Sequence, residues 1–294
     1  MKTTIKLLAL LTAIFVLAGC SAGKPADSPV TVPPSPSLSA EPSATPKPTP
    51  SLAPKKVVIE DYTAKEVERD KKAAMTNAPA DAKIEVNGKK YDGSLYDVSY
   101  QVYNGAEYYE YKGAGCIYSI YAGTDIVNGF YRLDYEGAGS CTKEECIEIA
   151  KKYASQFVDV DKYQLVSAEI SGDASDEYYL VTCRKFIDDV MTADGFTVSV
   201  STDGTPESYG RMYYKEFDDE NMDIDAIREE LKYIHSPEVI QKINDDIKGY
   251  QNYKDHKLSE MLVVLEDGSY AMKYTAEIHL SDYATMQSYI VTRK

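Results

Sequence analysis

Apolar residues recur every three to four positions after Thr142, which predicts a helix that buries one face. Thr142 and Glu145 have the spacing of a capping box, in which each side chain accepts a hydrogen bond from the other residue's backbone N–H. We therefore expect a helix from Thr142 to about Phe157. The residues expected on its buried face are Cys146, Ile149, Ala150, Tyr153 and Phe157.

Strand-forming segments follow this helix. From Phe196 to Val200, apolar residues alternate with Thr and Ser, as in a strand with one buried face. Asp203-Gly204 predicts a turn, because glycine accepts a positive φ. The expected strands are Tyr163–Ile170, Tyr178–Ile187, one that contains Phe196–Val200, and Ser208–Tyr214.

The same order of helix and then strands returns near the C-terminus, which predicts an internal duplication. Ser236-Pro237 is typical of a helix start, with serine as N-cap and proline at the first helical position. Asp267-Gly268 predicts a turn between two strands. The expected elements are helices at 224–234 and 236–247 and strands at Met261–Leu265, Tyr270–His279 and Tyr283–Thr292.

Residues 55–137 are expected to hold a helix from Thr63 to Thr76 and then an antiparallel meander of short strands rich in tyrosine. Dipeptides typical of hairpin turns separate these strands. They are Asn87-Gly88, Asp92-Gly93, Asn104-Gly105 and Asn128-Gly129.

The predicted fold class is α+β, built of tandem helix-plus-antiparallel-sheet modules (αβββ) after a disordered stalk. The expected parts are a leader (1–19), a stalk (20–54), a helix with a meander (55–137), a first module (138–217) and a weaker second module (218–294).

The helical segment from Thr142 to Ala154, together with Phe196–Val200, Asp203-Gly204 and Ser208-Tyr209, is similar to PepSY-like modules. These are helix-plus-sheet units of cystatin-like shape. The resemblance covers Cys141–Tyr214 best, Asp223–Lys294 loosely and Lys56–Gly137 hardly at all. It implies an extracytoplasmic domain of the kind found in propeptides of secreted metallopeptidases, where restraint of a peptidase has been proposed, and it implies no catalytic residues.

The N-terminus has the features of a lipoprotein leader. Two lysines precede an apolar run from Leu7 to Ala18 that is short for a membrane span. Leu17-Ala18-Gly19-Cys20 resembles the lipobox of bacterial lipoproteins, which implies that Cys20 becomes the lipidated N-terminus. An ordinary secretory leader with a chance cysteine is the alternative.

The segment Ser21–Pro54 contains ten of the 13 prolines and almost no large apolar residue, so we expect an extended stalk without a core. By analogy with Gram-positive surface proteins, the chain is expected at the outer surface of the cell membrane, held by its lipid anchor. An outer-membrane lipoprotein is the alternative. With 32 basic and 47 acidic residues, the chain is a poor partner for nucleic acid.

No catalytic motif is present in the sequence. The three histidines, His235, His256 and His279, lack the spacing of a metallopeptidase motif, and no G-x-S-x-G occurs. We expect no cofactor and no catalytic residue.

One acidic run has the spacing of a calcium loop, although Ile224 stands where such a loop needs glycine. The residues at the ligand positions are Asp219, Asn221, Asp223, Asp225 and Glu230. The alternative is that Asp223 caps a helix. We expect no metal from this run.

Four cysteines remain after Cys20, an even number that permits three pairings in an oxidising compartment. They are Cys116, Cys141, Cys146 and Cys183. Burial as small core residues is the alternative to a disulfide.

The sequence favours a membrane-anchored lipoprotein that binds a protein or peptide, such as a peptidase, without catalysis. A cell-wall-associated enzyme or solute-binding component is the alternative.

Overall fold

The computed structural model describes residues 55–62, 71–133, 140–172 and 177–294. The predicted leader, Cys20 and the predicted stalk lie outside the described residues, as does the part of the predicted Thr63–Thr76 helix that precedes residue 71.

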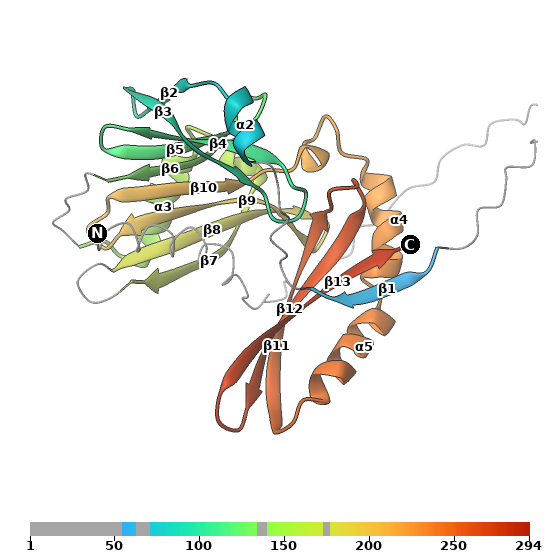
Figure 1. Cartoon of the computed structure of the whole chain (residues 1–294). Coiled ribbons are helices and arrows are strands. Elements are labelled where there is room, and N and C mark those ends of the chain that lie inside the picture. Colours follow the sequence, from blue (N-terminus) through green and yellow to red (C-terminus); the bar gives the residue numbers. More distant parts are fainter. Residues whose placement is uncertain (1–54, 63–70, 134–139, 173–176) are drawn as a thin grey trace, which may run out of the picture.

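Within the described residues, the chain forms 13 strands, four α-helices and two short 3-10 helices (Figure 1). The strands are β1 (Val57–Asp61), β2 (Asp81–Val86), β3 (Lys89–Tyr100), β4 (Glu107–Gly113), β5 (Cys116–Tyr121), β6 (Val127–Arg132), β7 (Gln164–Ser171), β8 (Tyr178–Ile187), β9 (Val190–Ser201), β10 (Pro206–Met212), β11 (Tyr253–Val264), β12 (Tyr270–Leu280) and β13 (Ala284–Arg293). The helices are α2 (Lys71–Asn77), α3 (Lys143–Ala154), α4 (Ile224–Ile234), α5 (Pro237–Lys248), η1 (Val160–Lys162) and η2 (Lys215–Phe217).

All 13 strands belong to one mixed sheet, so the predicted tandem αβββ modules are wrong. The sheet runs β1-β13-β12-β11-β9-β10-β6-β5-β4-β3-β2, and β8 and β7 continue from β9. Strands from different predicted segments pair directly: β6 with β10, β1 with β13, and β9 with β11 in parallel. These pairings replace separate sheets with a continuous one.

Helix α3 lies against β8, β9 and β10 and begins where the sequence predicts. The capping box is present: the Glu145 N–H donates to Thr142 Oγ1 at 3.3 Å, and the Thr142 N–H donates to Glu145 Oε2 at 2.8 Å. Cys146, Ala150 and Tyr153 are buried, as expected. Ile149 and Phe157 pack against the same core but stay partly exposed.

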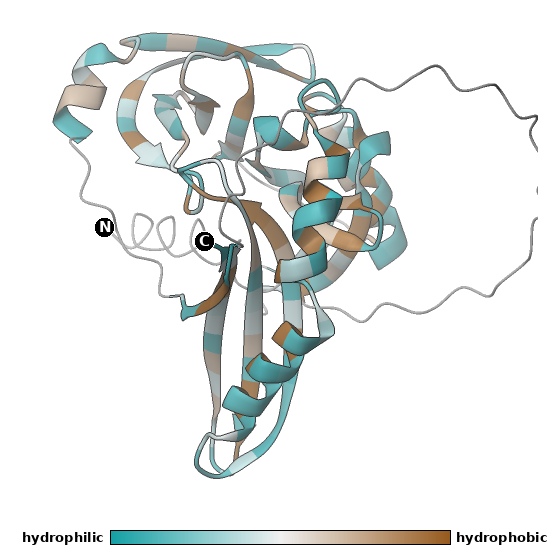
Figure 2. Cartoon of the chain, turned by 90° about the vertical axis from the view of Figure 1, so that its right-hand side faces the viewer, coloured by the Kyte–Doolittle hydropathy of each residue, from teal (hydrophilic) through white to brown (hydrophobic). Residues whose placement is uncertain are grey.

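Helices α4 and α5 cover the strands β11, β12 and β13 (Figure 1). Asp223 caps α4 and Ser236 caps α5, whose first residue is Pro237. Hydrophilic and hydrophobic residues mix along both helices (Figure 2). The residues that α4 and α5 bury in this core are Ile227, Leu231, Ile234, Val239, Ile243 and Ile247.

Two of the four predicted hairpin turns in the first meander are wrong. Asn87-Gly88 and Gly105 take positive φ angles between strands, as a turn requires. Gly93, however, lies inside β3, where a Cβ atom would stand 2.9 Å from the Tyr118 ring. Gly129 lies inside β6, where a Cβ atom would be 3.0 Å from Ser119 Oγ. These two glycines serve close packing rather than a turn.

Strand β9 is buried on both faces, not on one as its alternation predicts. Its polar side chains bond to neighbouring strands instead of water. Thr197 Oγ1 lies 3.3 Å from Thr182 Oγ1, and the Ser208 hydroxyl donates to Ser199 Oγ at 2.8 Å. Strand β9 pairs with β8 and β10 along its two edges, so these hydroxyls find their partners on the neighbouring strands.

Among the described residues, no helix combines the length and apolar character that a membrane crossing needs.

Candidate functional site

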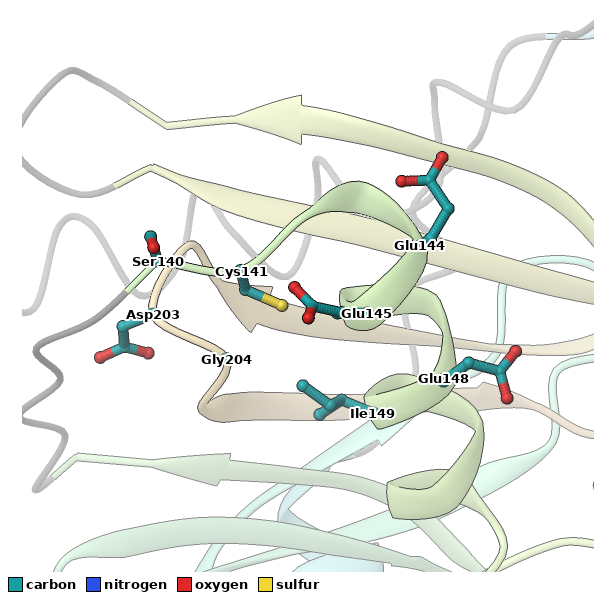
Figure 3. A pocket seen from close by; sticks show the side chains of 8 residues that line it. All are labelled: Ser140, Cys141, Glu144, Glu145, Glu148, Ile149, Asp203 and Gly204. Atoms are coloured by element: carbon teal, nitrogen blue, oxygen red, sulfur yellow. The ribbon is translucent and has the colours of Figure 1, made fainter.

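A shallow, open depression of about 630 Å³ lies where α3 begins, next to the turn between β9 and β10 (Figure 3). The capping box fixes the first turn of α3, and the Cys141 N–H donates to the Thr202 carbonyl oxygen at 2.5 Å. These bonds hold the helix start against the turn. The lining residues, which we call the acidic depression, are Ser140, Cys141, Glu144, Glu145, Glu148, Ile149, Asp203 and Gly204.

Two of the four carboxylates that line the acidic depression form hydrogen bonds that stabilise the local backbone. Glu145 turns back toward Cys141 (Figure 3), and the Thr142 N–H, followed by the Thr142 hydroxyl, lowers the pKa of Glu145. Asp203 accepts a hydrogen bond from the Thr205 N–H at 2.8 Å and another from the Ser201 hydroxyl. Both carboxylates therefore stabilise the helix start and the turn.

The other two carboxylates, Glu144 and Glu148, are exposed and point away from the helix (Figure 3). Glu148 has an exposed ion pair with Lys151 at 3.4 Å, which contributes little. Among the described residues, no histidine lines the depression. The arrangement can attract a cation or a basic side chain.

Of the four cysteines that could form a disulfide, the structure brings two together. The Sγ atoms of Cys141 and Cys146 are 2.7 Å apart. Cys141 is partly exposed in the depression, whereas Cys146 is buried. Cys116 and Cys183 are buried on β5 and β8.

The residues of the acidic run with calcium-loop spacing have different partners. Asp219 pairs with Lys162 at 2.7 Å and with Lys185 at 3.2 Å, and these lysines lower the pKa of Asp219. Asp223 accepts the Ala226 N–H at 3.0 Å as the cap of α4.

Glu230 pairs with Arg293 at 3.0 Å, Asp225 lies in the first turn of α4, and Asn221 is exposed before it. Within the described ranges, no three His, Cys, Asp or Glu side chains are grouped so that they could hold a metal ion.

The three histidines lie far from the acidic depression in sequence and have local partners. His235 Nδ1 is 2.9 Å from the Tyr274 hydroxyl. His256 lies between the Tyr253 hydroxyl and Asn244 Oδ1, each at 2.8 Å. His279 pairs with Glu277 and Asp255, and these carboxylates raise its pKa.

A buried polar network, not predicted from the sequence, centres on Asp194 of β9, which is 0% exposed. The Tyr163 hydroxyl donates to Asp194 Oδ1 at 3.4 Å, and Arg211 Nη2 donates to the Tyr163 oxygen at 3.3 Å. Asp194 Oδ2 has no hydrogen-bond partner among the described residues. Burial raises the pKa of Asp194 to about 6, although Arg211 opposes the shift.

The Asp194 network can hold a proton near neutral pH, but none of its residues lines the acidic depression. The only sequence signal was a single carboxylate in the middle of a strand otherwise built of apolar and small residues. That signal says nothing about Tyr163 and Arg211, which come from distant parts of the chain.

Comparison of the chain with models of protein families, with curated proteins and with solved structures finds no match.

Proposed function

We propose that this chain is a lipid-anchored extracytoplasmic protein that binds a basic protein or peptide segment through the acidic depression, without catalysis. The observation that carries the proposal is the placement of the depression relative to the first strand. Strand β1 and the turn between β9 and β10 lie on opposite sides of the molecule (Figure 1).

Strand β1 fixes the point at which the N-terminal segment joins the sheet. The Lys56 N–H donates to the Lys294 carbonyl oxygen at 2.6 Å, and the Lys294 N–H donates back to Lys56 at 2.9 Å. Lys294 also pairs with Glu60 at 3.0 Å. A stalk anchored through Cys20 would therefore hold the protein by this side and leave the acidic depression facing outward.

The negative charge of the acidic depression indicates that its partner is basic. Glu144 and Glu148 are exposed, and the chain as a whole carries a net charge of −15. Complementary charge speeds encounter and selects against acidic partners. The PepSY-like resemblance of Cys141–Tyr214 makes a secreted peptidase one candidate partner.

The test is affinity capture from the producer's secreted and envelope fractions with a Cys20→Ala chain as bait. We expect at least one basic protein to be retained. A bait with Glu144→Gln and Glu148→Gln should retain about tenfold less of it. A matched control with Asp125→Asn and Asp282→Asn, which removes the same charge from exposed positions elsewhere, should retain it unchanged.

Equal capture by the two double variants would contradict binding at the acidic depression. If both double variants retained less of the protein, the interaction would depend on the overall charge of the chain. That result would also contradict a specific site.

The second candidate is a cell-wall-associated enzyme or solute-binding component. The raised pKa of Asp194 favours it, because perturbed carboxylates gather at functional sites. The burial of Asp194 speaks against it, since a catalytic carboxylate must reach its substrate.

A further inference from the structure

We propose that Cys141 and Cys146 join in an intramolecular disulfide, and that Cys141 is the sulfur through which the bond forms. The inference goes beyond the proposed function, since the bond needs no binding partner. Its setting in an oxidising space rests on the proposed extracytoplasmic location, whereas its chemistry does not.

The local geometry of α3 brings the two sulfurs together. Thr142 is the N-cap, so Cys141 occupies the position before the cap and Cys146 the fourth position of the helix. Side chains at these two positions commonly pack on each other at the start of a helix. Here both are cysteines, and their Sγ atoms lie 2.7 Å apart. A disulfide has a length of about 2.05 Å, so a small approach of the sulfurs completes the bond.

The surroundings of the two sulfurs differ, which sets the order of reaction. Cys141 lines the open depression, where a reagent can reach it. Cys146 is 0% exposed, and burial, followed by its hydrogen bond to Cys141, raises the pKa of Cys146 to about 12. Cys141 therefore reacts with the oxidant first, and the buried Cys146 then forms the bond to Cys141.

The two remaining cysteines lie in other parts of the sheet. Cys116 is on β5 and Cys183 is on β8, and three strands separate them in the sheet order. Both are buried, and burial raises the pKa of Cys183 to about 11. We expect both to remain thiols.

The reaction is thiol–disulfide exchange with a small-molecule or protein disulfide as oxidant. The Cys141 thiolate attacks one sulfur of the oxidant, forms a mixed disulfide and releases one thiolate. Cys146 then gives up its proton and attacks the Cys141 sulfur, which releases the second thiolate. The protein loses two hydrogen atoms, and the oxidant is reduced to two thiols.

The bond would fasten the rim of the acidic depression. The Cys141 N–H is already bonded to Thr202, and the Cys141 Cβ and Sγ atoms lie against Gly204. A disulfide to α3 would tie the helix start to the turn between β9 and β10 through one residue.

The test uses the purified Cys20→Ala chain, which retains four cysteines, equilibrated with oxidised glutathione and then denatured and alkylated. We expect two alkylated thiols instead of four. Trypsin cuts between the two cysteines after Lys143. Mass spectrometry should then find peptides 133–143 and 144–151 joined, and reduction should separate them.

Single variants test the order of reaction. Cys146→Ala should accumulate glutathione on Cys141, whereas Cys141→Ser should leave Cys146 unmodified in the folded chain. Modification of Cys146 in the second variant would overturn the assigned order.

The result for the Cys20→Ala chain that retains the other four cysteines does not depend on either further variant folding. Four alkylated thiols after oxidation, or a link that involves peptide 113–132 with Cys116 or peptide 163–184 with Cys183, would overturn the proposal.

Discussion

The ring of Phe157 stacks on the ring of Tyr209, with the ring centroids 4.3 Å apart and 24° between the ring planes. Phe157 follows the end of α3, and Tyr209 is a buried residue of β10. Tyr209 in turn stacks on Phe196 of β9, with centroids 6.3 Å apart. This row of rings fixes the C-terminal end of α3 on the sheet, and thereby the direction from which its first turn meets the acidic depression.

Phe157→Ala should lower the free energy of unfolding by about 2–4 kcal/mol, because it removes a large apolar side chain and its aromatic contact. Phe157→Leu keeps most of the apolar volume and should cost less than half as much. Urea denaturation followed by circular dichroism measures both. A loss below about 0.5 kcal/mol for the alanine variant would mean that the stack does not hold α3.

Local elements were predictable from sequence where their signals are local. The α3 capping box and the Ser236-Pro237 start of α5 involve neighbouring residues, and both are present. Strand β8 has the predicted bounds Tyr178–Ile187. Capping and side-chain periodicity are satisfied within a few residues, so the sequence pattern carries them.

The assembly of the strands was not predictable in the same way. Phe130 of β6 pairs with Tyr209 of β10, and Val57 of β1 pairs with Arg293 of β13. No local pattern specifies which distant strand a strand will choose, because pairing depends on the whole sheet. The repeated order of helices and strands therefore predicted separate modules that the sheet does not contain.

In the candidate site, too, local features were predictable from the sequence and non-local packing was not. The predicted N-cap at Thr142 places Cys141 before the cap and Cys146 one turn later, but the sequence left the pairing of the four cysteines open. Asp194 is bonded to Tyr163, which follows η1, and Tyr163 is in turn bonded to Arg211 of β10. Non-local packing of this kind leaves no trace in the spacing of residues.

Asp194 should make stability depend on pH. Its folded-state pKa of about 6 lies above the ordinary aspartate value, so the folded chain binds a proton before the unfolded chain does as the pH falls. Stability from this group is therefore gained on acidification and lost as the pH rises through about 6.

Urea denaturation of the wild type and of Asp194→Asn at about pH 5 and about pH 7 measures this effect. We expect the wild type to gain about 1 kcal/mol relative to the variant at the lower pH. A stability difference that is the same at both values would show that Asp194 titrates normally.

Cys20 should decide where the protein is found. Cys20→Ala leaves no thiol to acylate, so the variant should move from the membrane to the medium, because lipid chains supply the anchoring energy. Detergent-phase partitioning and immunoblotting of cell and medium fractions measure the shift. If the variant still partitions into detergent, the lipid anchor at Cys20 is wrong.

Product analysis tests the proposal that the chain binds its partner without turnover. The purified Cys20→Ala chain is incubated with peptidoglycan fragments, peptides, glycans and any captured partner, and the products are followed by mass spectrometry. We expect every substrate to stay intact and the partner to remain bound. Reproducible turnover of any substrate, with loss of that turnover in Asp194→Asn, would contradict binding without catalysis. It would favour the alternative of a cell-wall-associated enzyme.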